Sequence, residues 1–223
     1  MLDKMLNVVE VFKAFEQGGK KIKVLESLNL SVANGEKVAI LGQSGSGKST
    51  LLTLLAGLDH PDSGSISINN QNLSSFKEDE LSKFRSKNVG IIFQQYHLMR
   101  HLTALENVSI PLELQKVDGA LDKATNALKS VGLSDRISHS PSQLSGGECQ
   151  RVAIARALIS EPNIILADEP SGNLDQKTGE EVMDLIFSLC EEQKQTLILV
   201  THNEILAKKC DRVLRLSNGI LIE

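Results

Sequence analysis

The chain contains no tryptophan, one tyrosine and only three cysteines among its 223 residues. The cysteines, Cys149, Cys190 and Cys210, are odd in number and widely spaced, and none belongs to a CxxC pair. This pattern argues against a disulfide framework and predicts free thiols in a reducing cytosol.

Long apolar runs are missing as well. No stretch approaches the roughly 18–20 apolar residues that a membrane-spanning helix needs. Residues 1–10 alternate charged and apolar side chains and lack the apolar core of a signal peptide. We therefore expect a soluble, cytoplasmic chain, so that any role at a membrane would come from a partner.

The chain also lacks an excess of positive charge. Its net charge is −4 and its pI is near 5.8, which argues against a nucleic-acid binder that relies on a broad basic surface. Lys20, Lys21 and Lys23 form one dense basic cluster, and a solvated loop explains it better than a phosphate-backbone site. We predict no nucleic-acid partner.

One glycine-rich segment carries the strongest functional signal, because it fits Gly-x4-Gly-Lys-[Ser/Thr]. The residues predicted to bind nucleotide there are Gly42, Gln43, Ser44, Gly45, Ser46, Gly47, Lys48, Ser49 and Thr50. The segment lies between an apolar run that predicts a strand, Lys37–Leu41, and one that predicts a helix, Thr50–Gly57. Such a loop aims backbone N–H groups at phosphate oxygens. It predicts binding of a nucleoside triphosphate, with Lys48 as an exposed loop side chain that meets the phosphate charge.

The rest of the chain alternates short apolar runs with helical patterns, which predicts a largely parallel α/β sheet. Near-continuous apolar runs predict buried strands at Val89–Phe93, Ile164–Ala167 and Thr196–Val200, with another strand at Val213–Leu216. Apolar residues at helical spacing predict a surface helix over Gly179–Cys190.

Two other regions have a different character. Three β-rich segments, Val8–Phe12, Val24–Val32 and Ser65–Asn69, predict an antiparallel β layer beside the nucleotide core. Helical patterns follow at 104–115, 118–131 and 146–159.

The predicted fold class is therefore α/β. It is a P-loop NTPase (RecA-like) core with an N-terminal antiparallel β layer and an inserted helical subdomain. We expect one domain over 1–223, in which 1–95 and 160–223 form the core and 96–159 form the helical subdomain.

Two carboxylates, Asp168 and Glu169, directly follow one of the predicted strands. Beside the glycine-rich loop, Asp168 would hold Mg²⁺ directly or through water, and the Ser49 hydroxyl would add an oxygen ligand. Glu169 would polarise a water molecule toward the γ-phosphate. The alternative is a pair of solvated carboxylates, but the preceding phosphate loop favours the catalytic interpretation.

The segment LSGGE at 144–148 precedes a predicted helix. Ser145 could act only as its N-cap, with Glu148 in the first turn. Alternatively, Gly146 and Gly147 expose backbone N–H groups and form a second anion site. One nucleotide needs one phosphate cradle, so a second makes sense if it closes over the nucleotide of another subunit.

With this segment, essentially the whole sequence resembles the ATP-binding subunits of ABC transporters. The resemblance implies an ATPase that uses ATP and Mg²⁺, forms a homodimer with ATP and pairs with integral membrane permease subunits. Each site would then take residues of the LSGGE segment in trans, namely Ser145, Gly146, Gly147 and Glu148.

Three further positions match functional residues of that family, and a fourth departs from its usual pattern. Gln94 matches the Q-loop glutamine, which contacts Mg²⁺ or the attacking water, and His202 matches the switch histidine that holds the γ-phosphate. The segment 171–175 matches the D-loop, so Asp175 would also act in trans. Phe15 stands where the family usually has an adenine-stacking tyrosine.

Weaker matches indicate the subfamily. Residues 57–64, 93–112 and 171–175 look like the lipoprotein-releasing and macrolide-exporter type, whose membrane subunits carry large extracytoplasmic domains. This implies export or lipoprotein release, with the chain peripheral on the inner face of the cell membrane. An importer or cell-division ATPase, or a non-transport ATPase of the same family, remains the alternative.

The segment 95–107 combines apolar and basic side chains, including Leu98, Met99 and Arg100. It predicts a groove for a short cytoplasmic helix of a membrane subunit. The alternative is that its apolar side chains pack between two subdomains.

Overall fold

A computed structural model describes residues 4–222 of the chain. The chain divides into two compact units. The first unit comprises Met1–Arg85 and Lys194–Glu223, and the second comprises Ser86–Gln193. The predicted division into a core and a helical subdomain rests on the order of strand and helix patterns along the sequence, and it stays a prediction.

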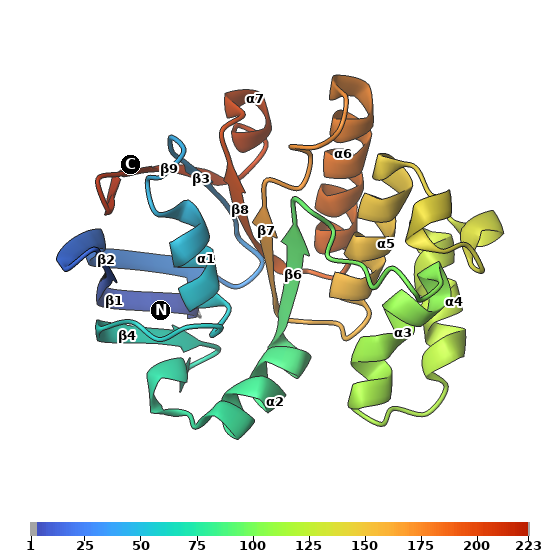
Figure 1. Cartoon of the computed structure of the whole chain (residues 1–223), viewed down its shortest axis with the longest axis horizontal. Coiled ribbons are helices and arrows are strands. Elements are labelled where there is room, and N and C mark those ends of the chain that lie inside the picture. The colour runs from blue at the N-terminus through green and yellow to red at the C-terminus, as the bar shows by residue number, and fades with distance from the viewer. Residues whose placement is uncertain (1–3, 223) are drawn as a thin grey trace. The chain divides into compact units, whose positions relative to one another are not determined.

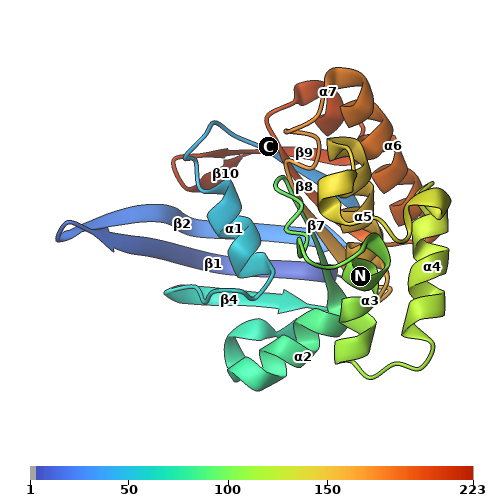
Figure 2. The ribbon, with the colours of Figure 1, turned by 45° about the vertical axis from the view of Figure 1, so that its right-hand side comes forward.

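An antiparallel sheet forms much of the first unit (Figure 1). It consists of β1 (Lys4–Gln17), β2 (Lys20–Ala33), β4 (Ser63–Ile68) and β5 (Gln71–Asn72), in the order β2-β1-β4-β5. Both strands of the β1–β2 hairpin are longer than predicted, and the hairpin extends beyond β4 in Figure 2. The predicted antiparallel β layer is confirmed.

A second group of strands in this unit is mainly parallel. β3 (Lys37–Leu41) lies between β8 (Thr196–Thr201) and β9 (Arg212–Ser217) and runs parallel to both, while β10 (Ile220–Ile222) pairs antiparallel with β9. All six residues of β8 are buried, as its apolar run predicts. Leu41 pairs with Thr201, so the segments that follow β3 and β8 begin at the same edge.

Helices follow these strands. α1 (Lys48–Leu55) starts two residues earlier than predicted, and the short α7 (Glu204–Ala207) follows β8. Sequence analysis missed α2 (Glu78–Asn88), in which only Leu81 and Phe84 are buried. Single 3-10 turns lie at Leu73–Ser75, Ser134–Arg136 and Pro141–Gln143.

The second unit contains a parallel strand pair and four helices. β6 (Val89–Phe93) pairs with β7 (Ile164–Asp168) so that Phe93 lies opposite Asp168. The helices are α3 (Ala104–Leu114), α4 (Ala120–Ser130), α5 (Gly146–Leu158) and α6 (Gln176–Glu192). The first three pack against one another, as the two views show, and α6 contacts α5. The predicted strands and helices of this unit are confirmed.

No helix within residues 4–222 is long and apolar enough to cross a membrane.

Candidate functional site

The phosphate loop in the first unit has the backbone geometry that its glycines predict. It follows β3 and leads into α1, whose N-cap is Gly47. Gly45 and Gly47 have φ angles of 80° and 101°, which residues with a side chain rarely adopt. A Cβ atom on Gly47 would also lie only 3.0 Å from the Val24 carbonyl oxygen. Gly47 therefore meets two requirements, a left-handed backbone and a close approach of β2.

Lys48 differs from the sequence-based expectation. It is only 8% exposed, whereas its position in the motif predicted an exposed side chain. Its Nζ donates to the carbonyl oxygens of Gly42 at 2.7 Å and Gln43 at 2.9 Å. These bonds hold the ammonium group against the loop. They also supply the polar partners that a buried charge needs.

The loop fits a phosphate ligand on two grounds. The buried Ser46 Oγ has no hydrogen-bond partner among the described residues, which is unusual for a buried polar group. The Lys48 ammonium and the backbone N–H groups at the start of α1 supply the positive field that an anion needs.

The position of Phe15 is fixed relative to this loop by the hairpin. Lys13 pairs with Leu25 and Ala14 with Lys23, so Val24 is an extra residue in β2. Val24 is also the residue that approaches Gly47. Phe15 in β1 pairs with Ile22, which lies two residues before Val24 in β2. The Phe15 residue is 45% exposed. An exposed aromatic ring thus lies on the hairpin close to the phosphate loop.

His202 directly follows β8 and is exposed. Because β3 and β8 are parallel neighbours with Leu41 opposite Thr201, His202 and the phosphate loop begin at the same edge of the first unit.

In the second unit, the Q-loop and D-loop residues form one hydrogen-bonded cluster. Gln94 Nε2 donates to Asn173 Oδ1 at 3.1 Å, and Asn173 Nδ2 donates to the Gln94 carbonyl at 2.9 Å. The Gly172 N–H donates to the Glu169 carbonyl at 2.9 Å. Since Phe93 lies opposite Asp168, Gln94 and Glu169 both follow the ends of neighbouring parallel strands.

The LSGGE segment forms a complete capping box. The Glu148 N–H donates to Ser145 Oγ at 3.2 Å, and the Ser145 N–H donates to Glu148 Oε2 at 2.7 Å. Arg136 Nε also donates to Glu148 Oε1 at 2.9 Å. The Ser145 backbone bond and then Arg136 lower the pKa of Glu148 from 4.5 to about 2. The segment therefore caps α5. Ser145 and Gly146 remain exposed, whereas Gly147 is buried, contrary to the prediction that both glycines expose their backbone.

Asp175 and Cys149 are also placed by local packing. Asp175 is exposed and caps α6, with Oδ1 accepting from the Thr178 N–H at 3.1 Å. Cys149 is buried, and burial raises the pKa of its thiol, so it remains protonated at neutral pH. All three cysteines are free, as their spacing predicts.

The oxygen donors suit Mg²⁺ in kind. No group of three or more His, Cys, Asp or Glu residues in the described chain could hold a metal ion. The predicted donors are the Ser49 hydroxyl, the Gln94 amide oxygen and the Asp168 carboxylate, which are oxygen ligands of the kind that Mg²⁺ takes together with phosphate and water oxygens.

Comparison with known proteins decides the family. The sequence model described as ABC transporter matches residues 25–172, which is more than half of the chain. The chain belongs to the ABC transporter family. It is therefore an ATP-binding, ATP-hydrolysing subunit.

Individual relatives of this ABC subunit match along nearly their whole length. It is 45% identical to a "Lipoprotein-releasing system ATP-binding protein LolD" of Legionella pneumophila (strain Lens), covering 99% of this chain and 98% of the relative. It is 48% identical to an "Uncharacterized ABC transporter ATP-binding protein YbbA" of Escherichia coli (strain K12), covering 97% of both.

A solved structure gives the same result. The ATP-binding cassette MJ0796, described as a dimeric post-hydrolysis state bound to ADP and Pi, aligns with a TM-score of 0.91 at 42% identity. The alignment covers 98% of this chain and 97% of that one. The predicted family and P-loop NTPase fold are confirmed.

Sequence reasoning missed several residues that hold the site together. Asn173 belongs to the segment that matches the D-loop, but nothing in the sequence predicts its bonds to Gln94. Arg156 donates to the carbonyls of Tyr96 and His97, both at 2.6 Å, and thereby fixes the segment after Gln94. Its signal, a second arginine among the apolar residues in the last turns of α5, can be read in the sequence only once the helix's inner face is known.

Proposed function

We propose that this ATPase subunit dimerises head to tail around two ATP molecules and drives lipoprotein release or export through membrane subunits. In each site the P-loop, Asp168, Glu169, Gln94 and His202 come from one chain. Ser145–Glu148 and Asp175 come from the other. Closure of the dimer would move the membrane subunits, and hydrolysis would reopen it.

The proposed roles follow the chemistry of each side chain. Lys48 and the loop N–H groups bind the phosphates and stabilise their negative charge. Ser49, Asp168 and Gln94 provide oxygen ligands or water contacts for Mg²⁺, which supplies charge neutralisation when bound. Glu169 orients the attacking water, His202 holds the γ-phosphate, and Phe15 stacks on the adenine.

The exposed start of α5 carries the dimer proposal. Ser145 and Gly146 are exposed, although the capping box already satisfies the needs of the helix itself. Gly147 is buried, and a Cβ atom there would lie 2.6 Å from Thr178 Cγ2, so packing accounts for this glycine. An exposed helix N-terminus at Ser145 and Gly146 is suited to an anion from outside, and the dimeric state reported for MJ0796 supports a second chain as the source.

The partner proposal rests on relatives. The name of the Legionella protein assigns it to a lipoprotein-releasing system. We propose the same role here, with the chain peripheral on the inner face of the cell membrane and bound to permease subunits with large extracytoplasmic domains. Co-purification of the tagged chain from its native membranes, with identification of the bound membrane protein, tests this role. Recovery of an importer permease or a cell-division protein instead would contradict it.

Glu169→Gln tests the catalytic proposal. It keeps the side-chain shape but loses the anionic group that orients water. We expect ATP binding, hydrolysis slowed by at least about a hundredfold, and an ATP-dependent dimer by size-exclusion chromatography with light scattering.

Asp168→Asn is the paired variant, and it should instead weaken nucleotide binding and its dependence on Mg²⁺. Glu161→Gln, at an exposed site outside the motifs, serves as the control. A Glu169→Gln protein that stays monomeric with ATP and hydrolyses at the parent rate would refute the mechanism.

A further inference from the structure

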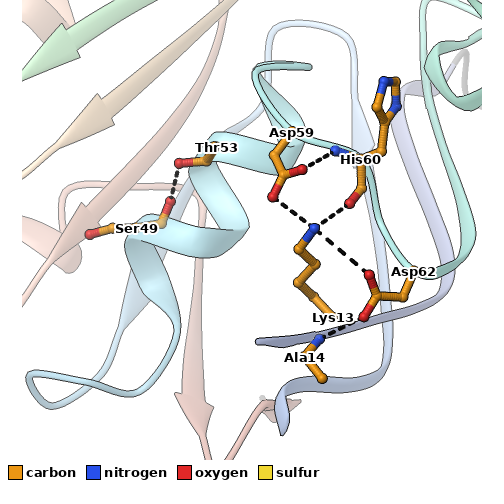
Figure 3. A network of polar contacts seen from close by, with 7 residues as sticks. All are labelled: Lys13, Ala14, Ser49, Thr53, Asp59, His60 and Asp62. Carbon is orange, nitrogen blue, oxygen red and sulfur yellow. Dashed lines mark hydrogen bonds and ion pairs between the residues drawn. The ribbon is translucent and has the colours of Figure 1, made fainter. Parts of the chain in front are cut away.

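Lys13 in β1 is a buried lysine that the phosphate chemistry does not use. It is 8% exposed, and its Nζ lies 2.7 Å from Asp59 Oδ2, 2.7 Å from the His60 carbonyl oxygen and 3.8 Å from Asp62 Oδ1 (Figure 3). The Lys13 bond is the main cause that lowers the pKa of Asp59, so that carboxylate stays ionised. The ammonium group therefore sits in a fixed cage of oxygen atoms.

The cage is attached to β1 by its backbone. The Ala14 N–H donates to Asp62 Oδ2 at 2.9 Å, as Figure 3 shows, and the Asp62 N–H donates to the Phe12 carbonyl at 2.9 Å. These bonds hold the loop after α1 against the irregular part of the hairpin. Lys13 is thereby held in one position, although lysine side chains are otherwise flexible.

The same ammonium group lies over the Phe15 ring, 5.3 Å from the ring centroid. Phe15 is nevertheless 45% exposed. The cation thus occupies one face of the ring, and the ring still offers surface to a ligand. An ammonium over an aromatic face is attractive because the face carries negative charge density.

We propose that Lys13 is a positioning residue for nucleotide binding, which holds the Phe15 ring in place to stack on the adenine base. This inference rests on the proposed role of Phe15 as the base contact. Fixing the ring before ATP arrives lowers the ordering cost of binding. Because the effect passes through the base, it concerns affinity for the nucleoside and not for the triphosphate group.

Lys13→Met tests the proposal, because methionine keeps much of the apolar stem and removes the charge. We expect the KM for ATP to rise about three- to tenfold, in line with a cation–π contact, while kcat changes by less than about twofold. By calorimetry the Kd for ATP should rise equally, and the Kd for Mg·tripolyphosphate, which has no base, should not change. Lys13→Arg should restore most of the ATP affinity.

Lys21→Met is the matched control. Lys21 Nζ lies 5.6 Å from the centroid of the Phe12 ring on the same hairpin, so this variant also removes a cation from an aromatic ring. It should leave both Kd values unchanged. Asp59→Asn is the second variant should Lys13→Met fail to fold, and it should raise the KM for ATP by a smaller factor.

A double-mutant cycle separates the possible failures. Phe15→Leu should raise the KM for ATP, and Lys13→Met should add nothing in that background. If Phe15→Leu leaves the KM unchanged, the base contact itself is wrong, while the phosphate site remains testable through Lys48. If Phe15→Leu raises the KM but Lys13→Met has its full effect in that background, or weakens ATP and tripolyphosphate equally, the positioning role is overturned.

Discussion

At the scale of single residues, Lys48 in the phosphate loop is both buried and expected to bind phosphate. The side chain is buried against the loop and bonded to the Gly42 and Gln43 carbonyls. When a phosphate group binds, its oxygens would replace these carbonyl oxygens as acceptors of the Lys48 ammonium group and would form stronger, charge-assisted hydrogen bonds. Lys48 is therefore held close to where the ligand charge is expected, at little further ordering cost.

Lys48→Ala should reduce ATP hydrolysis by at least about a hundredfold, because it removes the cation that stabilises phosphate charge. It should also lower the free energy of unfolding by about 1 kcal/mol, since the Gly42 and Gln43 carbonyls lose their donor. Steady-state turnover and chemical denaturation measure the two effects. Lys87→Ala, at an exposed position of α2, is the control. A folded Lys48→Ala protein with normal turnover would refute the P-loop assignment.

The identity of these residues was predictable, but their environment was not. The motif spacing gave the P-loop residues, yet it placed Lys48 at the surface. Lys13 gave no signal, because a lysine in an alternating strand normally points to solvent. Its burial depends on the carboxylates of Asp59 and Asp62, which reach β1 only in the folded chain. Long-range pairing of this kind leaves no local pattern.

At the scale of elements, apolar periodicity predicted the strands well because buried parallel strands are almost entirely apolar. β3, β6 and β8 match their runs closely. α2 escaped prediction because it is mostly polar and buries only Leu81 and Phe84. A run of acidic residues at its start, Glu78–Glu80, was the available signal for a helix N-terminus.

The cap of α5 predicts a pH dependence. The folded-state pKa of Glu148 is about 2, below its ordinary 4.5. The cap therefore contributes fully above the unfolded-state pKa, and its contribution is lost as the pH falls toward 2. Glu148→Gln should lower the free energy of unfolding at pH 7 by about 1 kcal/mol, and this difference should shrink steadily below pH 4.5. Urea denaturation across that range measures it, and a difference independent of pH would contradict the assigned pKa.

The segment 95–107 gives a prediction about docking. Met99 is 46% exposed and Leu98 is half-buried. The backbone of Met99 is fixed by Asn107, whose Oδ1 accepts from its N–H at 2.8 Å and whose Nδ2 donates to its carbonyl at 3.1 Å. An exposed apolar residue whose backbone is held by Asn107 suits a partner helix.

Replacing Leu98 and Met99 with Asp should abolish co-purification with the membrane subunit while ATPase activity of the isolated chain persists. Leu121→Asp, at an exposed position of α4, is the control and should leave co-purification intact. A large fall in melting temperature would instead assign these side chains to the protein interior, and unchanged co-purification would place docking elsewhere.

At the scale of the whole molecule, family membership accounts for one chain with two segments that are predicted to bind anions. The phosphate loop lies in the first unit and the LSGGE segment begins a helix of the second. The sequence predicted both from motifs. What it left open was whether capping alone explains LSGGE, and the capping box together with an exposed Ser145 and Gly146 supports both roles at once.

The central claim is that each ATP site takes its P-loop from one chain and its LSGGE segment from the other. Mixing two inactive variants tests it most directly. Lys48→Ala disables the P-loop, and Ser145→Asp keeps an N-cap while placing a negative charge where the phosphate would bind. Each variant alone should be inactive. Their heterodimer should contain one site with an intact P-loop and an intact LSGGE segment, so ATPase activity should reappear on mixing. Failure of the mixture to exceed the summed activities of the separate proteins would contradict the head-to-tail composite site.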